Sequence, residues 1–239
     1  MEQLVAKEGQ EVDFLPIQGT DYLEFYVGNA KQAAHFYQST FGFQPLAYSG
    51  PETGVRDRVS YVVQQQNIRL VLTSPLEADS EIAEFHRQHG DAVKAYGIRV
   101  EDAEYSYQAT TKRGGDPYMA PNTLEDDHGK VTLSGIHTYG DVVHVFVERE
   151  NYTGTFMPYF KEWNPVFRTE EVGFKHVDHC VGNVPLGHMN RWVDFYADVM
   201  GFTNLLSFDD QDISTEYSAL MSKVMTNGNG FVKFPINEP

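Results

Sequence analysis

Residues 175–202 read KHVDHCVGNVPLGHMNRWVDFYADVMGF, and residues 22–43 read YLEFYVGNAKQAAHFYQSTFGF. Both segments contain a Val-Gly-Asn step, then apolar residues at helical spacing, and then a closing Gly-Phe pair. This order predicts a strand, then a helix that starts near the asparagine and ends at a left-handed glycine. Because the same pattern occurs twice, we expect a fold built from a repeated module.

Alternating apolar residues extend each copy of the pattern into a longer module. After the first helix, two short alternating runs predict two strands. A second, less regular copy starts near residue 95 and ends in strands at 130–136 and 142–148. The later copy ends in two strands around TNGNG at 226–230, where Asn-Gly favours a hairpin turn. The sequence therefore predicts an α+β fold of repeated βαβββ modules.

The modules predict two domains. Residues 1–150 would form an N-terminal domain of two modules, at about 21–75 and 95–150. Residues 151–172, which contain two prolines, would connect it to a C-terminal domain at 173–239. Each half-sheet has an apolar face that needs a partner, so the first two modules would cover each other. We expect the third module to lack its partner because the chain is truncated before a fourth.

Charge and composition exclude several classes of partner. The chain has 239 residues, with 18 basic and 34 acidic side chains and a net charge of −16. Such a surface repels nucleic acid and anionic membranes. The single cysteine, Cys180, forms no intramolecular disulfide, which fits a reducing cytoplasm. No apolar run has the length of a signal peptide or a membrane span, so we expect a soluble, cytoplasmic protein.

One residue distinguishes the third module from the other two. When the three opening strands are placed in register, this position holds Phe25, Ile98 and His179. Alternate residues of a strand share a face, so Val177, His179 and Val181 would form an inward face with an imidazole at its centre. His179 is therefore the candidate metal ligand of this chain.

Spacing places no other histidine beside His179. A mononuclear non-haem iron site needs two histidines and a carboxylate on one side of the metal. His176 and Asp178 would point to a different face of the strand. Four further histidines are expected to be solvated or at the surface: His86, His89, His137 and His144. The residues alone leave two interpretations of His179 open, a half-buried histidine bonded to a neighbour and a metal ligand.

Three C-terminal motifs, HVDHCVGN at 176–183, EYSALMSKV at 216–224 and KFPINEP at 233–239, closely resemble the 4-hydroxyphenylpyruvate dioxygenase family. The resemblance continues through VGNAKQAAHFY, YSGPE and VLTSP in the N-terminal part. It implies the vicinal oxygen chelate fold, in which βαβββ modules pair into two barrels. The N-terminal barrel would be structural, and the C-terminal catalytic barrel, which holds Fe(II), would be incomplete in this chain.

The resemblance also assigns residues. It implies that His179 is the first iron ligand and that Ser222 and Asn237 line the substrate pocket, with Val224 and Pro235 in the neighbouring wall. It identifies no separate catalytic residue. The family's remaining ligands, a second histidine and a glutamate, belong to the fourth module. We therefore expect this chain alone to bind Fe(II) poorly and to be inactive.

The implied reaction is the Fe(II)-dependent oxidative decarboxylation and ring hydroxylation of 4-hydroxyphenylpyruvate by O₂. Its product is homogentisate, in the catabolism of tyrosine and phenylalanine. The substrate would chelate iron through two oxygens of its α-keto acid. The full-length protein is expected to be a homo-oligomer.

Three alternatives stay open. A 4-hydroxymandelate synthase would oxidise the benzylic carbon of the same substrate, although Asn237 favours the dioxygenase. A non-catalytic protein of the same fold would hold a small molecule between paired modules, but a candidate ligand in only one module favours an enzyme. An inert fragment is the third alternative.

Overall fold

The computed structural model describes residues 13–208 and 220–239, and it contains three segments with the order strand, helix and further strands. The first module comprises β1 (Ile17–Tyr26), α1 (Ala30–Phe41), β2 (Gln44–Ser49), β3 (Arg58–Gln65) and β4 (Ile68–Pro75). The second module follows α2 (Glu81–His89), and it comprises β5 (Ala92–Val100), α3 (Ala103–Thr111), β6 (Pro117–Asp126), β7 (Gly129–His137) and β8 (Val143–Glu148). The α+β class and the repeated module are confirmed.

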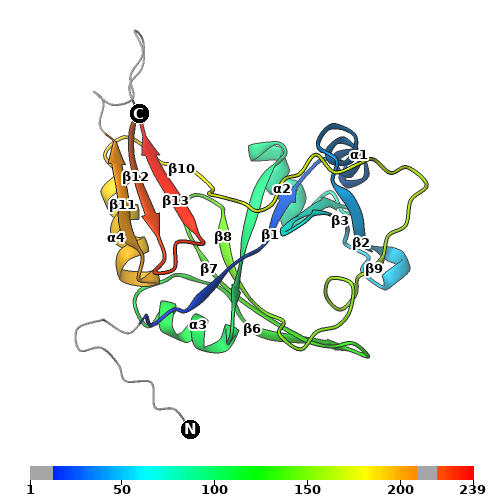
Figure 1. The fold of residues 1–239 in the computed structure, drawn as a ribbon, viewed down its shortest axis with the longest axis horizontal. Helices are drawn as coiled ribbons and strands as arrows, with labels where there is room; N and C mark the ends of the chain where they lie inside the picture. Colours follow the sequence, from blue (N-terminus) through cyan, green and yellow to red (C-terminus); the bar gives the residue numbers. More distant parts are fainter. Residues whose placement is uncertain (1–12, 209–219) are drawn as a thin grey trace.

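The first two modules share one nine-stranded sheet, in the order β6-β7-β8-β5-β1-β4-β3-β2-β9. In each module the opening and closing strands are parallel neighbours, β1 with β4 and β5 with β8. The two opening strands, β1 and β5, pair antiparallel and so join the modules. Figure 1 shows α1 and α3 at opposite ends of this sheet. The remaining strand, β9 (Lys161–Glu162), adds to the edge at β2.

The third module forms a smaller sheet. It comprises β10 (Gly182–Asn183), α4 (Met189–Met200), β11 (Thr203–Phe208), β12 (Met221–Thr226) and β13 (Lys233–Glu238). The strand order is β10-β13-β12-β11, with β10 parallel to β13. The predicted hairpin around residues 226–230 is confirmed, because β12 and β13 pair antiparallel across it. This sheet and α4 are the orange and red part at the left of Figure 1.

Local sequence signals set the helix ends. The side chain of Asn29 accepts a hydrogen bond of 3.0 Å from the backbone N–H of Gln32, which caps α1. The helices α1 and α4 both end at glycines with a φ of 70°, Gly42 and Gly201. Only glycine adopts this left-handed conformation without strain, so the Gly-Phe pairs fix where both helices stop.

The larger hydrophobic core joins the third module to the first two. It contains Ile98 of β5 together with Tyr196 of α4 and Phe234 of β13. The Phe234 ring lies 4.9 Å from the rings of both Tyr96 and His144. The third module therefore packs on the face of the nine-stranded sheet that also carries α1 and α3.

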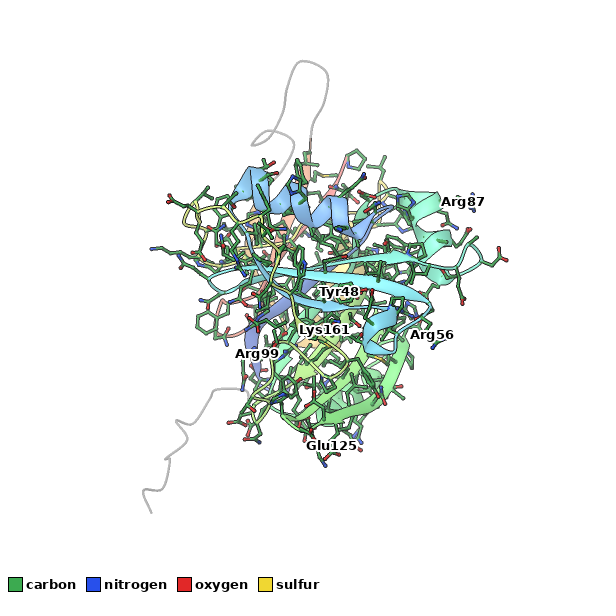
Figure 2. All side chains as sticks on the ribbon, turned by 90° about the vertical axis from the view of Figure 1, so that its right-hand side faces the viewer. Tyr48, Arg56, Arg87, Arg99, Glu125 and Lys161 are labelled. Carbon is green, nitrogen blue, oxygen red and sulfur yellow. The ribbon has the colours of Figure 1, made fainter. Side chains whose placement is uncertain are left out.

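The opposite face of the nine-stranded sheet, called here the inner face, carries a second core. Tyr22, Val62 and Val145 belong to it, and Phe156 and Met157 pack against them from outside the sheet. Both come from the segment 151–172, which was predicted to be a connection. The same segment supplies β9, where Lys161 lies over the ring of Tyr48 (Figure 2). This segment therefore covers the inner face as well as connecting the modules.

The opening strand of the third module is shorter than predicted. A strand with an inward face at Val177, His179 and Val181 was expected, but the strand is confined to Gly182–Asn183, and Val181 is 47% exposed. In the first module the opening strand is held between β4 and β5. Among the described residues β10 pairs with β13 alone, so this opening strand has one neighbouring strand where β1 has two.

Candidate substrate pocket and metal ligand

Two neighbouring strands of the third module bring the predicted pocket residues together. In the register of β12 and β13, Ser222 lies opposite Asn237 and Val224 lies opposite Pro235. Directly opposed residues share a face of the sheet. Phe234 and Met225 form the alternate pair and belong to the core on the α4 side. The four predicted residues therefore lie on the face turned away from α4, called here the open face.

The polar pair at the centre of the open face is not fully bonded. Ser222 is 5% exposed, and Asn237 lies beside it on β13. The side-chain oxygen of Asn237 is buried and accepts no hydrogen bond within the described residues. A buried amide oxygen without a donor costs free energy, and a ligand hydroxyl would satisfy it. The pair is therefore suited to hold a polar group of a substrate.

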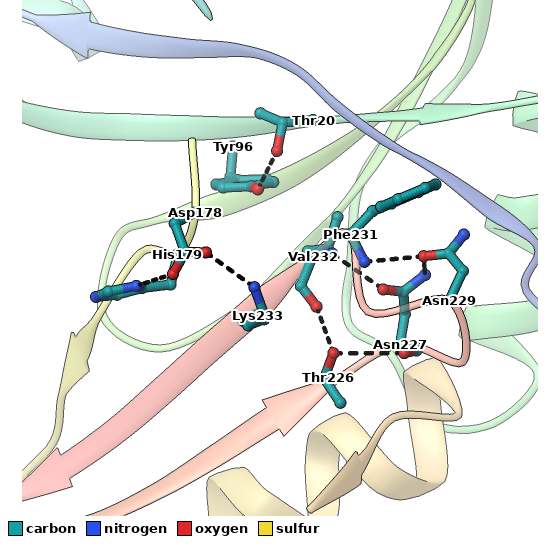
Figure 3. A network of polar contacts seen from close by, with 10 residues as sticks. All are labelled: Thr20, Tyr96, Asp178, His179, Thr226, Asn227, Asn229, Phe231, Val232 and Lys233. Atoms are coloured by element: carbon teal, nitrogen blue, oxygen red, sulfur yellow. Dashed lines mark hydrogen bonds and ion pairs between the residues drawn. The ribbon is translucent and has the colours of Figure 1, made fainter. Parts of the chain in front are cut away.

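His179 is held by its neighbour in the sequence. Its Nδ1 lies 2.7 Å from Oδ2 of Asp178, and the other oxygen of Asp178 lies 3.0 Å from Nζ of Lys233 (Figure 3). Hydrogen bonds from His179 and Lys233 lower the pKa of Asp178 to about 2. The expectation that Asp178 points away from His179 is thus wrong, because residues 174–181 lack the strand geometry that would separate them.

The Asp178–His179 contact bears directly on metal binding. A histidine whose Nδ1–H donates to a carboxylate presents the lone pair of Nε2, as metal-binding histidines commonly do. The His179 side chain is 49% exposed, so an ion can reach this nitrogen. His179 therefore fits the first ligand position of an Fe(II) site. The adjacent Asp178-His179 pair in the sequence was the signal for this contact.

The other ligands of such a site are not assembled in the described part of the chain. No group of three or more His, Cys, Asp or Glu side chains there could hold a metal ion. His86 and His89 instead contact carboxylates, Asp91 at 3.0 Å and Asp141 at 2.7 Å. Residues 216–219 of the EYSALMSKV motif lie outside the described residues.

His144 was predicted to lie at the surface, but it is buried. It is 1% exposed, and its Nε2 lies 2.8 Å from the hydroxyl of Tyr196. Burial lowers the pKa of His144 to about 3, so the imidazole is neutral. The prediction failed because β8 alone does not indicate that α4 covers it. His144 therefore belongs to the contact between the second and third modules.

Comparison with known proteins identifies relatives along most of the chain. Residues 13–159 match the family model described as "Hydroxyphenylpyruvate dioxygenase, HPPD, N-terminal". The chain is 40% identical over 230 residues to 4-hydroxyphenylpyruvate dioxygenase of Yarrowia lipolytica, a match covering 92% of this chain and 58% of that protein. It is 42% identical over 229 residues to the Dictyostelium discoideum enzyme of the same name, covering 93% and 62%.

The fold of this chain is similar to that of a solved structure. A mutant of 4-hydroxymandelate synthase from Streptomyces coelicolor superposes with a TM-score of 0.81 and 23% identity, covering 94% of this chain and 64% of that one. The chain thus spans about three fifths of the curated relatives, 58% and 62% in the two cases above. No helix in the described ranges is long and apolar enough to cross a membrane.

Proposed function

Because this chain belongs to the 4-hydroxyphenylpyruvate dioxygenase family, we propose that it forms the N-terminal three fifths of an enzyme that converts 4-hydroxyphenylpyruvate and O₂ to homogentisate. Relatives that bear this name match 92% and 93% of the chain at 40% and 42% identity. The observation that carries the proposal is the register of β12 and β13, which sets Ser222 opposite Asn237 on the open face.

Each named residue has a role that follows from its atoms. His179 would donate Nε2 to Fe(II), while Asp178 keeps the proton on Nδ1. When bound, the iron supplies redox activation of O₂ and a template for the α-keto acid. Asn237 would accept a hydrogen bond from the substrate through its unpaired amide oxygen. Ser222 would orient the same polar group from the opposite strand, against a wall formed by Val224 and Pro235.

Among the described residues, His179 is the one ligand that we assign to the proposed iron site. We therefore expect the purified chain to release no homogentisate when it is supplied with Fe(II), O₂ and 4-hydroxyphenylpyruvate. Clear turnover by this chain would contradict the assignment of the remaining ligands to the part of the relatives that it does not span. Its single cysteine fits our proposal that the enzyme works in the reducing cytoplasm. The family resemblance is the basis for our proposal that the full-length protein is a homo-oligomer.

A chimera tests the pocket residues. Residues 1–239 are joined to the remaining C-terminal part of the Yarrowia lipolytica relative, and homogentisate is measured by chromatography. Asn237→Ala should raise KM and lower kcat/KM about tenfold or more, since one hydrogen bond to the substrate is lost. Asn190→Ala is the matched control, because Asn190 lies on α4 and bonds to Lys223 on the opposite side of the sheet.

The product separates the two related activities. Ring hydroxylation gives homogentisate, whereas benzylic oxidation gives 4-hydroxymandelate. The likeness to the Streptomyces coelicolor synthase, at 23% identity, concerns the fold alone. If the chimera forms 4-hydroxymandelate, the proposed reaction is wrong and the enzyme is a 4-hydroxymandelate synthase. If the Asn237→Ala and Asn190→Ala variants have equal kinetics, Asn237 does not bind the substrate.

A further inference from the structure

The inner face of the nine-stranded sheet borders a cavity that is separate from the open face of the third module. Its volume is about 320 Å³. Both modules line it, through Tyr22 and Tyr26 of β1 and Leu133 of β7, and Phe156 and Phe160 close over it from the segment after β8. Pockets of this size, with apolar walls and a few polar groups, are typical of small-molecule sites.

One carboxyl group reaches this cavity from the central strand. Glu24 lies on β1 among the lining residues. The hydroxyl of Thr73 donates to its Oε1 at 2.8 Å, and the hydroxyl of Ser60 lies 2.8 Å from that of Thr73. Within the described residues its second oxygen, Oε2, accepts no hydrogen bond. Burial raises the pKa of Glu24, as expected of a carboxyl group among apolar side chains.

The cations near Glu24 are bonded to other groups. The ammonium of Lys94 lies 3.0 Å from Oε1 of Glu81 and donates to the backbone oxygen of Asp141 at 2.9 Å. The guanidinium of Arg58 lies 2.6 Å from Oδ2 of Asp57. Glu24 therefore has no ion pair within the described residues. Glu24 is half-buried and lines the cavity, so its second oxygen is accessible from the cavity and is available to a ligand.

The chemistry of the cavity selects a class of ligand. A hydroxyl group can donate to a carboxylate and can also accept from a protonated carboxyl group, so it bonds to Glu24 in either state. An ammonium ligand would suit only the ionised state and would be repelled by Lys94 and Arg58. Aromatic rings pack edge to face, as Tyr22 and Phe156 already do at 5.8 Å. A cavity of about 150 Å³ is enough for benzene, so this one has room for a substituted ring.

We propose that the inner-face cavity binds one small, uncharged aromatic molecule that carries a hydroxyl group. The ring lies against Tyr22 and Phe156, and the hydroxyl bonds to Glu24. This site is separate from the proposed iron site, and it requires neither a metal nor the rest of the relatives. It therefore stands whether or not the proposed reaction is correct.

Titration calorimetry with two probes tests the proposal on the metal-free 239-residue chain. Phenol and toluene differ in one hydroxyl group, and phenol should bind about tenfold more tightly through Glu24. Glu24→Leu should remove this preference, and Glu24→Gln should keep part of it, since the amide still bonds to a hydroxyl. Leu133→Trp should weaken both probes by filling the cavity. Glu77→Leu, at an exposed position outside the cavity, is the matched control.

The outcomes separate specific binding from simple partition into an apolar space. Equal affinity of the wild-type chain for phenol and toluene would overturn the role of Glu24. Absence of binding by both probes would overturn the site itself. The comparison of phenol with toluene uses the wild-type chain, so it does not depend on whether a variant folds. Retention of the phenol preference in a folded Glu24→Leu variant would likewise contradict the proposal.

Discussion

At the scale of single residues, two desolvated titratable groups have opposite pKa shifts for the same physical reason. Burial disfavours the charged form, so it lowers the pKa of His144 to about 3 and raises that of Glu24. Neither shift was visible in the sequence, where His144 is one of nine histidines and Glu24 one of many acidic residues. Burial is a property of the assembled sheets, so the pattern of one strand does not reveal it.

His144 should make the protein sensitive to acid. Its pKa is about 6.5 in an unfolded chain and about 3 in the fold, so the unfolded state binds the extra proton between these values. The free energy of unfolding should therefore fall as the pH drops from 6.5 towards 3, by up to about 1.4 kcal/mol per pH unit from this group. His144→Gln should remove this part of the slope in urea titrations from pH 6.5 to 4. The exposed His128→Gln variant should keep it, and equal slopes in both variants would show that His144 does not cause the acid sensitivity.

Glu24 should act in the opposite direction. Its folded pKa lies above its usual value of 4.5, so the folded state holds the proton more tightly. The stabilisation is complete below pH 4.5 and is lost as the pH rises through the folded pKa. Arg58, Lys94 and Glu81 act on the same carboxyl group, and desolvation is the larger effect. Stability curves of Glu24→Gln should lack this decline, whereas a curve parallel to the wild type would show that the carboxyl group is not desolvated.

At the scale of elements, the sequence predicted the parts that local signals determine. Asn29 and Gly42 mark both ends of α1, and the Asn-Gly turn marks the β12–β13 hairpin. The opening strand of the third module was predicted too long, because strand formation depends on neighbours that lie far away in the sequence. The same limit applies to the candidate site. The resemblance supplied Ser222 and Asn237, but only the strand register sets them opposite each other.

Substitutions at two glycines distinguish the cost of a left-handed backbone conformation from the cost of a steric clash. Gly42 and Gly140 both have positive φ, at 70° and 61°. A Cβ at Gly42 would collide with the backbone oxygen of Glu170, while a Cβ at Gly140 would meet nothing within 4 Å. Gly140→Ala should cost about 1 kcal/mol from conformation alone, and Gly42→Ala should cost about 3 kcal/mol. Thermal unfolding measures both, and equal losses would mean that the segment near Glu170 does not pack against α1.

At the scale of the whole molecule, the third module packs against the nine-stranded sheet through a shared hydrophobic core. The sequence of one module alone does not predict this core. Tyr196 and Phe234 of this module pack against His144 and Tyr96 of the nine-stranded sheet. Its edge strand is less well covered. Within the described residues β11 lies at the edge of the sheet, and its Leu205 and Leu206 are 50% and 52% exposed. Apolar side chains on an unpaired edge favour association between copies.

We therefore expect the purified chain to self-associate at high concentration. Leu206→Glu should shift the mass measured by light scattering towards the monomer, since a charge on the edge strand opposes pairing. Leu76→Glu is the matched control, because Leu76 is 49% exposed but lies outside the third module. A wild-type chain that stays monomeric over the whole concentration range would count against an interface at β11.

We propose that His179 is an iron ligand of a 4-hydroxyphenylpyruvate dioxygenase. The most direct measurement is Fe(II)-dependent homogentisate formation by the chimera with the Yarrowia lipolytica C-terminal part, in paired His179→Ala and His176→Ala variants. Both histidines are exposed and lie three positions apart, so the pair controls for loss of an imidazole. We predict that His179→Ala reduces activity about a hundredfold or more, while His176→Ala retains it. Equal activity of the two variants would contradict the assignment of His179.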